Sequence, residues 1–333
     1  MYTRRDLGKI ALASLPLAKT LGAVDSKFGG VQIGAITYSF REMHDLDSII
    51  DAMVKCGLGE AELMSNQAEA ALGAPAPQFP RPVNMGQRRP ATAPGAGAGP
   101  GARPRVAREP MTEEQIAAAR ARTADLRNWR LGVSMDKFKD VRKKFDNAGI
   151  DIRLLCFNMN QAITDEEIDY AFQMAKALGA RAMSTTTQVS VSKRVAPFAD
   201  KHKMMVGYHG HDATWDPNEF ATPESFATAM SYSKYNGVNL DIGHFTAAGY
   251  DPVAYIQEHH ARITNLHLKD RMKDHGPNKP WGEGQTPIKP VLLLLKDAKY
   301  PIPANIEYEY GQPGMDTIEE MKKCVQYCKD ALA

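Results

Sequence analysis

A regular alternation of strand-like and helix-like segments runs along the chain from about residue 31, and no other feature limits the possible folds as strongly. Short hydrophobic runs are separated by longer segments whose apolar residues recur at helical spacing. The predicted strands are 31–38, 60–64, 152–157, 181–186, 204–208, 238–242, 263–268 and 305–308. The predicted helices are 46–55, 112–148 (as one helix or two), 165–178, 192–201, 223–235, 252–260, 288–298 and 317–331. Strict alternation indicates a parallel sheet, because each helix returns the chain to the edge where the next strand begins.

The number of these units predicts a closed sheet. Eight strand–helix units in about 300 residues fit one (β/α)8 TIM barrel, an α/β fold, better than two open sheets. The chain has 333 residues, of which 43% are hydrophobic, so it is long enough to bury one large core. At two predicted helix starts, Thr164 and Glu167 have the spacing of a capping box, and Thr222 precedes Pro223. We therefore expect residues 28–333 to form a single barrel domain.

One segment, residues 73–110, breaks the alternation. It is dense in Pro, Ala, Gly and Arg and has almost no large apolar residue, so it cannot bury enough surface to offset the entropy of ordering. We predict a disordered low-complexity insertion after the second strand, on the face of the barrel that carries catalytic loops. A lid or a basic tether is the functional alternative to a solvated loop, and both are left open.

The N-terminus has the order of features found in export signals. Arg4 and Arg5 are followed by the apolar stretch 10–17 and by small residues at 22–23. The segment resembles a twin-arginine signal, so we expect residues 1–27 to engage the export machinery and the protein to be periplasmic. A basic start to an ordinary helix is the alternative. No apolar run approaches the roughly 20 residues that span a bilayer, so we expect no stable membrane span.

Composition narrows the range of partners. The formal net charge is +2, which implies no strong field for nucleic acid or for an anionic membrane, and leaves small molecules as the expected partners. Export would permit disulfides between the four cysteines. Cys324 and Cys328 lie four residues apart on a predicted helix, and we expect this shared face to pack against the barrel. The sequence leaves a homo-oligomer open.

Polar side chains that can bind metals end the last four predicted strands. The fifth strand ends in His209 and His211, the sixth in Asp241 with His244 just beyond, the seventh in His267, and the eighth in Glu307 and Glu309. Parallel strands in a barrel direct their C-terminal ends toward one axis, so these groups are expected to meet. Imidazole and carboxylate ligands suit Mn²⁺, Co²⁺, Zn²⁺, Fe²⁺ or Mg²⁺ and do not choose among them. We predict one shared divalent-metal site.

The motifs at these strand ends resemble a known family. They are Gly-Tyr-His-Gly-His (207–211), Asp-Ile-Gly-His (241–244), His-Leu-Lys-Asp-Arg (267–271) and Ile-Glu-Tyr-Glu (306–309). From about Val31 to the C-terminus, apart from the insertion, the chain resembles the xylose-isomerase-like TIM-barrel superfamily of sugar phosphate isomerases and epimerases. The resemblance implies Asp241, His267 and Glu307 as metal ligands. His209 stands where the family has a glutamate, so it is either the fourth ligand or an acid/base group.

The same resemblance implies roles for residues around the metal. His211 and His244 match histidines that contact substrate hydroxyls, and Glu62 resembles a position at the rim of the pocket. The expected substrate-binding residues are Glu62, His211, Lys269, Arg271 and Glu309, and the expected catalytic residues are Glu307, His209 and His244. For Lys269, Asp270 and Arg271 the alternative is a buried ion-pair network beneath the site.

These parts imply chemistry on a sugar or keto-sugar. A metal that chelates two adjacent oxygens acidifies the neighbouring C–H group and stabilises an enediolate, so we expect a metal-dependent sugar isomerase or epimerase. Epimerases of the family place carboxylates on both sides of one carbon. With His209 in one of these places, a lyase or hydrolase of 3-keto-glycosides is an alternative. A non-catalytic sugar-binding protein is a further one, and an endonuclease would need more carboxylates and a basic track for DNA.

Overall fold

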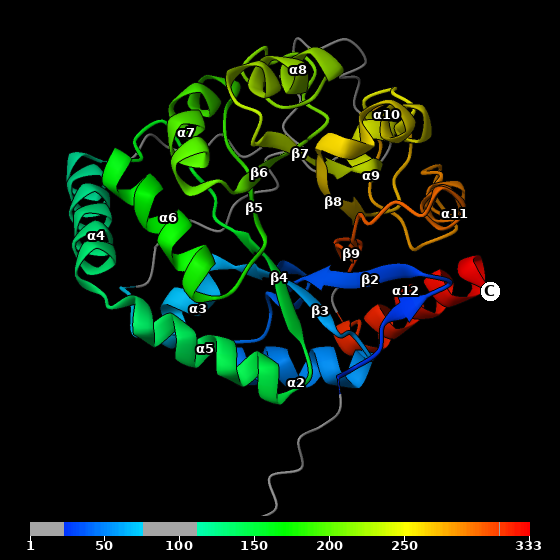
Figure 1. The fold of residues 1–333 in the computed structure, drawn as a ribbon, viewed down its shortest axis with the longest axis horizontal. Coiled ribbons are helices and arrows are strands. Elements are labelled where there is room, and N and C mark those ends of the chain that lie inside the picture. The colour runs from blue at the N-terminus through cyan, green and yellow to red at the C-terminus, as the bar shows by residue number, and fades with distance from the viewer. Residues whose placement is uncertain (1–22, 76–111, 313) are drawn as a thin grey trace, which may run out of the picture.

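The computed structural model describes residues 23–75, 112–312 and 314–333. In these residues eight parallel strands, β2 to β9, pair in sequence order, and β9 pairs back with β2 to close a barrel (Figure 1). The strands are β2 (Val31–Ile36), β3 (Glu60–Met64), β4 (Asp151–Cys156), β5 (Ala182–Thr185), β6 (Met205–His209), β7 (Asn236–Asp241), β8 (Ile263–Leu268) and β9 (Ala304–Ile306). The predicted TIM barrel is therefore confirmed.

Helices surround the barrel and follow the strands along the chain (Figure 1). They are α2 (Leu46–Cys56), α3 (Ser65–Ala71), α4 (Glu113–Gly132), α5 (Met135–Asn147), α6 (Asp165–Ala177), α7 (Val189–His202), α8 (Pro223–Tyr232), α9 (Ile242–Ala247), α10 (Pro252–His259), α11 (Ile288–Ala298) and α12 (Thr317–Leu332). Both predicted N-caps are present, and the side chains of Thr164 and Thr222 accept hydrogen bonds from the backbone three residues on. Cys324 and Cys328 are buried in the face that α12 packs on the barrel, as predicted.

Two short helices, α3 and α9, were not predicted. Each begins directly after a barrel strand, and neither is long enough to show an apolar period. At α9, Asp241 both ends β7 and caps the helix, since its Oδ1 accepts a hydrogen bond of 2.7 Å from the N–H of His244. The helix therefore starts inside the motif that we read as the end of a strand.

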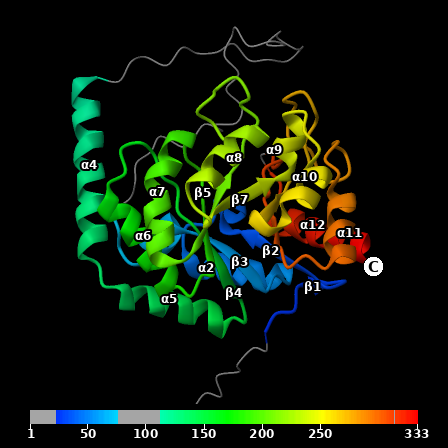
Figure 2. The same cartoon turned by 45° about the horizontal axis from the view of Figure 1, so that its top comes forward.

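The helix α4 attaches to the barrel through buried ion pairs as well as through the apolar side chains of Leu126 and Trp129. Leu126 is its only buried residue, whereas Arg130 is 14% exposed and lies between the carboxylates of Glu69 and Glu167. Figure 2 shows α4 at the edge of the molecule, beside α6. This helix follows the insertion, so its attachment fixes one end of that segment.

Parts of two predictions lie outside the described residues: most of the expected signal, at 1–22, and most of the expected insertion, at 76–110. The described chain contacts the barrel before residue 28. The N–H of Val24 donates to the carbonyl of Gly149 at 3.0 Å, Ser26 is buried, and β1 (Lys27–Phe28) pairs antiparallel with β2. Across the described ranges, no helix combines the length and apolar character of a membrane span.

Candidate metal centre

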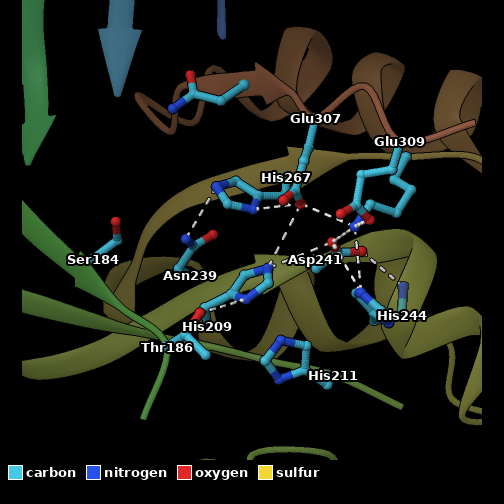
Figure 3. Close-up of polar contacts among 12 residues, drawn as sticks. Ser184, Thr186, His209, His211, Asn239, Asp241, His244, His267, Glu307 and Glu309 are labelled. Atoms are coloured by element: carbon cyan, nitrogen blue, oxygen red, sulfur yellow. Dashed lines mark hydrogen bonds and ion pairs between the residues drawn. The ribbon is translucent and has the colours of Figure 1, made fainter. Parts of the chain in front are cut away.

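The C-terminal ends of four adjacent strands bring together the predicted ligands. His209 ends β6, Asp241 ends β7, His267 lies near the end of β8, and Glu307 follows β9. One ligand atom from each residue lies within 4.8 Å of the other three, and all four residues are buried (Figure 3). The four residues meet because neighbouring parallel strands, β6 to β9, place their C-terminal ends at the same face of the barrel. This is the arrangement that the strand endings predicted.

The imidazole of His209 faces the other members of the cluster. Its Nε2 lies 3.5 Å from Asp241 Oδ2 and 3.8 Å from Glu307 Oε2, while its Nδ1 lies 3.3 Å from the hydroxyl of Thr186. Burial lowers the pKa of His209 against the effect of Asp241, so the ring is neutral. A neutral ring with Nδ1 occupied by Thr186 has its Nε2 lone pair available to a cation.

Two buried polar atoms in the cluster lack a hydrogen bond, and they are His209 Nε2 and Asp241 Oδ2. The ammonium of Lys269 lies 3.1 Å from Asp241 Oδ2, but the contact is ionic and lacks hydrogen-bond direction. Buried polar groups in proteins almost always make hydrogen bonds, so two facing atoms that make none require an explanation. A divalent cation between them satisfies both, and a set of two histidines and two carboxylates fits such an ion.

His267 lies between two carboxylates. Its Nδ1 is 2.9 Å from Glu307 Oε2 and its Nε2 is 2.7 Å from Glu62 Oε2. Burial opposes the charged form of His267, but Glu62 and Glu307 hold its pKa well above the ordinary value. The pKa of Glu307 is held below its usual range, against burial, by Lys269 and His267, so this carboxylate is ionised.

Lys269 supplies the second buried positive charge. Its Nζ lies 3.0 Å from Glu307 Oε2 and 2.6 Å from Glu309 Oε2, and these carboxylates with Asp241 raise the pKa of the ammonium despite burial. Lys269 therefore belongs to the site itself. Its neighbour Asp270 faces away and accepts hydrogen bonds from the N–H groups of Gly282, Gly284 and Thr286. The buried network that we considered for this segment is thus divided, and Asp270 supports the loop after β8.

A second cluster adjoins the first, and Asp212 is its centre. Asp212 Oδ1 lies 3.3 Å from Nδ1 of His244 and 3.1 Å from a guanidinium nitrogen of Arg271, and Oδ2 lies 3.3 Å from His275 Nδ1. Burial and the charge of Lys269 lower the pKa of His244 to about 4, so this ring is neutral. His244 Nε2 lies 3.3 Å from Lys269 Nζ, which joins the two clusters.

His211 has a carboxylate partner of its own. Its Nδ1 lies 2.8 Å from Glu219 Oε1, and its ring packs edge-on against the rings of His209 and His244. Burial opposes protonation, but Glu219 raises the pKa of His211. His211 is therefore an imidazole that is oriented by Glu219 and lies beside the predicted ligands.

The structure corrects the expected place of Glu62. It does not lie at the rim of a pocket, because its exposed fraction is 0% and it lies inside the barrel behind His267. The sequence suggested that Glu62 ends its strand, but β3 continues to Met64, and the side chain of Glu62 accepts hydrogen bonds from Asn265 and Asn305. Glu309 is nearer the surface, with 17% of its side chain exposed.

Several residues of the site were missed from sequence. Asp212 directly follows the His-Gly-His motif and was not predicted, although an aspartate beside two histidines was a usable signal. Tyr38 lies beyond β2, and burial together with the carboxylates of Glu309 and Glu307 raises the pKa of its phenol. Glu219 is eight residues from His211 in an irregular segment, so no spacing rule connects the two.

Comparisons with known proteins agree with this architecture. The family model described as Xylose isomerase-like TIM barrel matches residues 120–329. Comparison with curated proteins finds no match. Solved structures with the same fold include a sugar phosphate isomerase/epimerase from Parabacteroides distasonis, at 15% identity and a TM-score of 0.56, covering 94% of this chain and 99% of that one.

Two further structures share the fold at similar distance. The probable 3-DHS dehydratase AsbF from Bacillus anthracis is 13% identical, with a TM-score of 0.57 over 89% of this chain and 98% of that one. The IOLI protein, solved with a bound zinc atom, is 12% identical, with a TM-score of 0.57 over 91% and 99%. Identities this low establish the fold alone, whereas the family model matches more than half of the residues. The chain belongs to the xylose isomerase-like TIM-barrel family.

Proposed function

We propose that this protein is a divalent-metal-dependent sugar isomerase or epimerase that works through an enediolate. The observation that carries the proposal is the buried cluster of His209, Asp241, His267 and Glu307, whose ligand atoms lie within 4.8 Å of one another. Two of these atoms, on His209 and Asp241, have no hydrogen bond of their own. Family membership supports a small-molecule substrate, and similar folds include a sugar phosphate isomerase/epimerase.

The four residues of the cluster would hold the ion, which would polarise a bound carbonyl and acidify the adjacent C–H group. Lys269 and His267 keep Glu307 ionised, so its carboxylate is available to remove that proton. The imidazoles of His211 and His244 are fixed by Glu219 and Asp212, and they present defined nitrogen atoms to substrate hydroxyls. This assignment uses neither nitrogen of His209 for proton transfer.

A lyase or hydrolase of 3-keto-glycosides is the second candidate, and the pairing of His211 with Glu219 favours it. A symmetric epimerase needs a base on each side of one carbon. Here the base Glu307 is joined by His211, whose pairing with Glu219 raises its pKa and so favours the protonated form that a proton donor needs. A base and an acid in one site suit elimination, in which the base removes a proton beside the ketone and the acid protonates the departing oxygen.

One experiment separates the two candidates. The metal-loaded protein is incubated in D2O with unphosphorylated ketoses and aldoses in one arm and with 3-keto-glycosides in the other, and both are followed by NMR. Deuterium incorporation beside the sugar carbonyl, lost in Glu307→Gln, supports the isomerase or epimerase. Release of the aglycone, lost in both Glu307→Gln and His211→Asn, supports the lyase. Exchange or release in neither arm overturns both and leaves a sugar-binding protein.

We also propose that the protein is exported to the periplasm through the twin-arginine pathway, where unphosphorylated sugars are the accessible substrates. The support is Arg4-Arg5 and the apolar stretch after it. The N–H of Val24 already bonds the barrel at Gly149, so processing before Val24 would leave these contacts intact. Fractionation of cells that express wild type or a variant with Arg4→Lys and Arg5→Lys tests this, and periplasmic recovery of the variant would refute the pathway.

A further inference from the structure

Three of the four ligands are the last residue of a repeated tripeptide. Asn239-Leu-Asp241, Asn265-Leu-His267 and Asn305-Ile-Glu307 each place an asparagine two residues before a ligand, on consecutive barrel strands. Side chains two apart on a strand share a face, so the three asparagines lie inside the barrel one layer below the ligands. The interior of a TIM barrel is usually filled by branched apolar residues. Three buried side-chain amides in this layer therefore require hydrogen-bond partners, and they share one.

That partner is Glu62. The amide nitrogens of Asn265 and Asn305 donate to its Oε2 at 2.8 and 3.1 Å, and that of Asn239 lies 3.4 Å from its Oε1. The hydroxyl of Ser184 also donates to Oε1. The amide oxygens of Asn239 and Asn305 are left without hydrogen bonds, so these side chains are turned to give their donors to Glu62. The layer is organised around one carboxylate.

The remaining contact of Glu62 is with His267 Nε2, at 2.7 Å, and the amide nitrogen of Asn239 lies 3.2 Å from the same Nε2. Glu62 is 0% exposed, and its two oxygens are surrounded by protein donors, so it has no surface to offer a substrate. The contact with Glu62 is the shorter of the two, and an ionised carboxylate only accepts hydrogen bonds, so the geometry favours a proton on the Nε2 of His267. The other nitrogen, Nδ1, then lies on the side of Glu307 and the cluster.

We propose that Glu62 is a positioning residue that fixes the ring of His267 and keeps its proton on Nε2, so that Nδ1 is the metal ligand. Three asparagines hold the carboxylate in place from below. The proposal rests on the metal site of the proposed function, and it gives Glu62 a role other than the substrate contact expected from sequence. A carboxylate behind a ligating histidine fixes the tautomer and raises the basicity of the ligand.

The test compares Glu62→Gln with Glu60→Gln. Glu60 is a matched control because it lies two residues earlier on the same strand, is 2% exposed, and has no hydrogen bond to either carboxylate oxygen. Cobalt affinity is measured by competition with a chromogenic chelator, and the cobalt absorption spectrum reports the ligand set. We expect affinity to fall about 10- to 100-fold in Glu62→Gln, and within about twofold of wild type in Glu60→Gln.

A second measurement needs no substitution. In zinc-loaded wild type with ¹⁵N-labelled histidine, NMR is expected to show His267 protonated at Nε2 and metallated at Nδ1. Unchanged cobalt affinity in a folded Glu62→Gln, or metal on Nε2, overturns the role of Glu62 and leaves the metal site standing. If Glu62→Gln does not fold, the NMR result alone decides. A wild type that binds neither cobalt nor zinc overturns the proposed function itself, and the role of Glu62 with it.

Discussion

The ammonium nitrogen of Lys269 lies 3.1 Å from Oδ2 of Asp241, and both side chains are buried. The oxygen that faces the predicted cation is therefore already near a fixed positive charge. An ion pair in such surroundings is weakly screened, so the ammonium and a divalent ion act on the same carboxylate charge. Lys269 stabilises the metal-free site and at the same time opposes binding of the metal.

Replacing Lys269 by methionine separates these effects. Without metal, the variant leaves Asp241, Glu307 and Glu309 without their shared cation, so we expect the free energy of unfolding to fall by about 3–5 kcal/mol. We expect cobalt to bind more tightly than to wild type and to recover most of the lost stability. Thermal unfolding with and without cobalt measures both. Lys143→Met, which removes an exposed pair with Asp140, is the control and should change neither the stability nor the cobalt affinity. If metal-free Lys269→Met were as stable as metal-free wild type, Lys269 would not stabilise the metal-free site.

Removal of single ligands tests the assignment of His209. Its Nε2 faces Asp241 and Glu307 without a hydrogen bond, so we expect His209→Ala and Asp241→Asn each to lower cobalt affinity by more than about 100-fold. Metal analysis after dialysis and chelator competition provide the measurement. His202→Ala is the control, since the side chain of His202 is only 8% exposed and pairs with Asp169 outside the site. Metal lost from Asp241→Asn but kept in His209→Ala would make His209 an acid/base group.

The strand ends were predictable because their signal is local. A hydrophobic run followed by His, Asp or Glu can be read from a few residues, and the barrel then brings such ends together, as it does for Asp241 and His267. The partners that tune these groups were not predictable in the same way. Glu62 is 205 residues from His267 along the chain, and only the closed barrel joins them. The family resemblance implied a rim position for Glu62, and nothing in the local sequence of β3 indicated its distant partner.

The layer of asparagines shows a second reason why parts of the site could not be predicted from sequence. The pattern Asn-x-ligand is visible on three strands, but its meaning depends on which face of each strand points inward. The short helix α9 also depended on tertiary context, because Asp241 serves both as a strand end and as a cap. Strong periodic segments such as α11 were predicted with their observed bounds, since their apolar spacing needs no partner.

Glu60 should make stability depend on pH. Burial raises its pKa to about 8 from the ordinary 4.5, so the folded protein keeps a proton that the unfolded chain releases. Below about pH 4.5 both states are protonated. Between about pH 4.5 and 8 the folded state binds more protons, so the free energy of unfolding falls as pH rises, by up to about 1.4 kcal/mol per pH unit.

The substitution Glu60→Gln removes this dependence. We expect the variant to be more stable than wild type at pH 8, by an amount on the order of 3–5 kcal/mol, and close to wild type at pH 5. Urea unfolding of both proteins at the two pH values gives the difference directly, and other titrating groups cancel in the comparison. The same difference at pH 5 and pH 8 would show that Glu60 does not hold its proton in the folded state.

Arg130 is the main attachment of α4. Its guanidinium binds both oxygens of Glu69, at 2.8 and 3.0 Å, and Oε1 of Glu167 at 3.1 Å, and it lies over the ring of Phe157. Leu126 is buried and Trp129 packs edge-on against Phe138, but the most buried ion pairs of the helix are those of this guanidinium, since Arg127, which also pairs with Glu167, is 31% exposed. Arg130→Met should therefore release α4 from the barrel while leaving the barrel folded.

Hydrogen exchange resolves this local opening from global unfolding. We expect the amides of α4 in Arg130→Met to exchange with a protection free energy lowered by about 3–5 kcal/mol, or down to that of an isolated helix, while the strands stay protected. Arg181→Met is the matched control, because its guanidinium pairs with Asp151 at the surface with 61% of the side chain exposed, and its loss should cost at most about 1 kcal/mol. If α4 kept wild-type protection in Arg130→Met, its attachment would have to come from the apolar contacts of Leu126 and Trp129 or from the Arg127–Glu167 pair, and Arg130 would not be what holds this helix to the barrel.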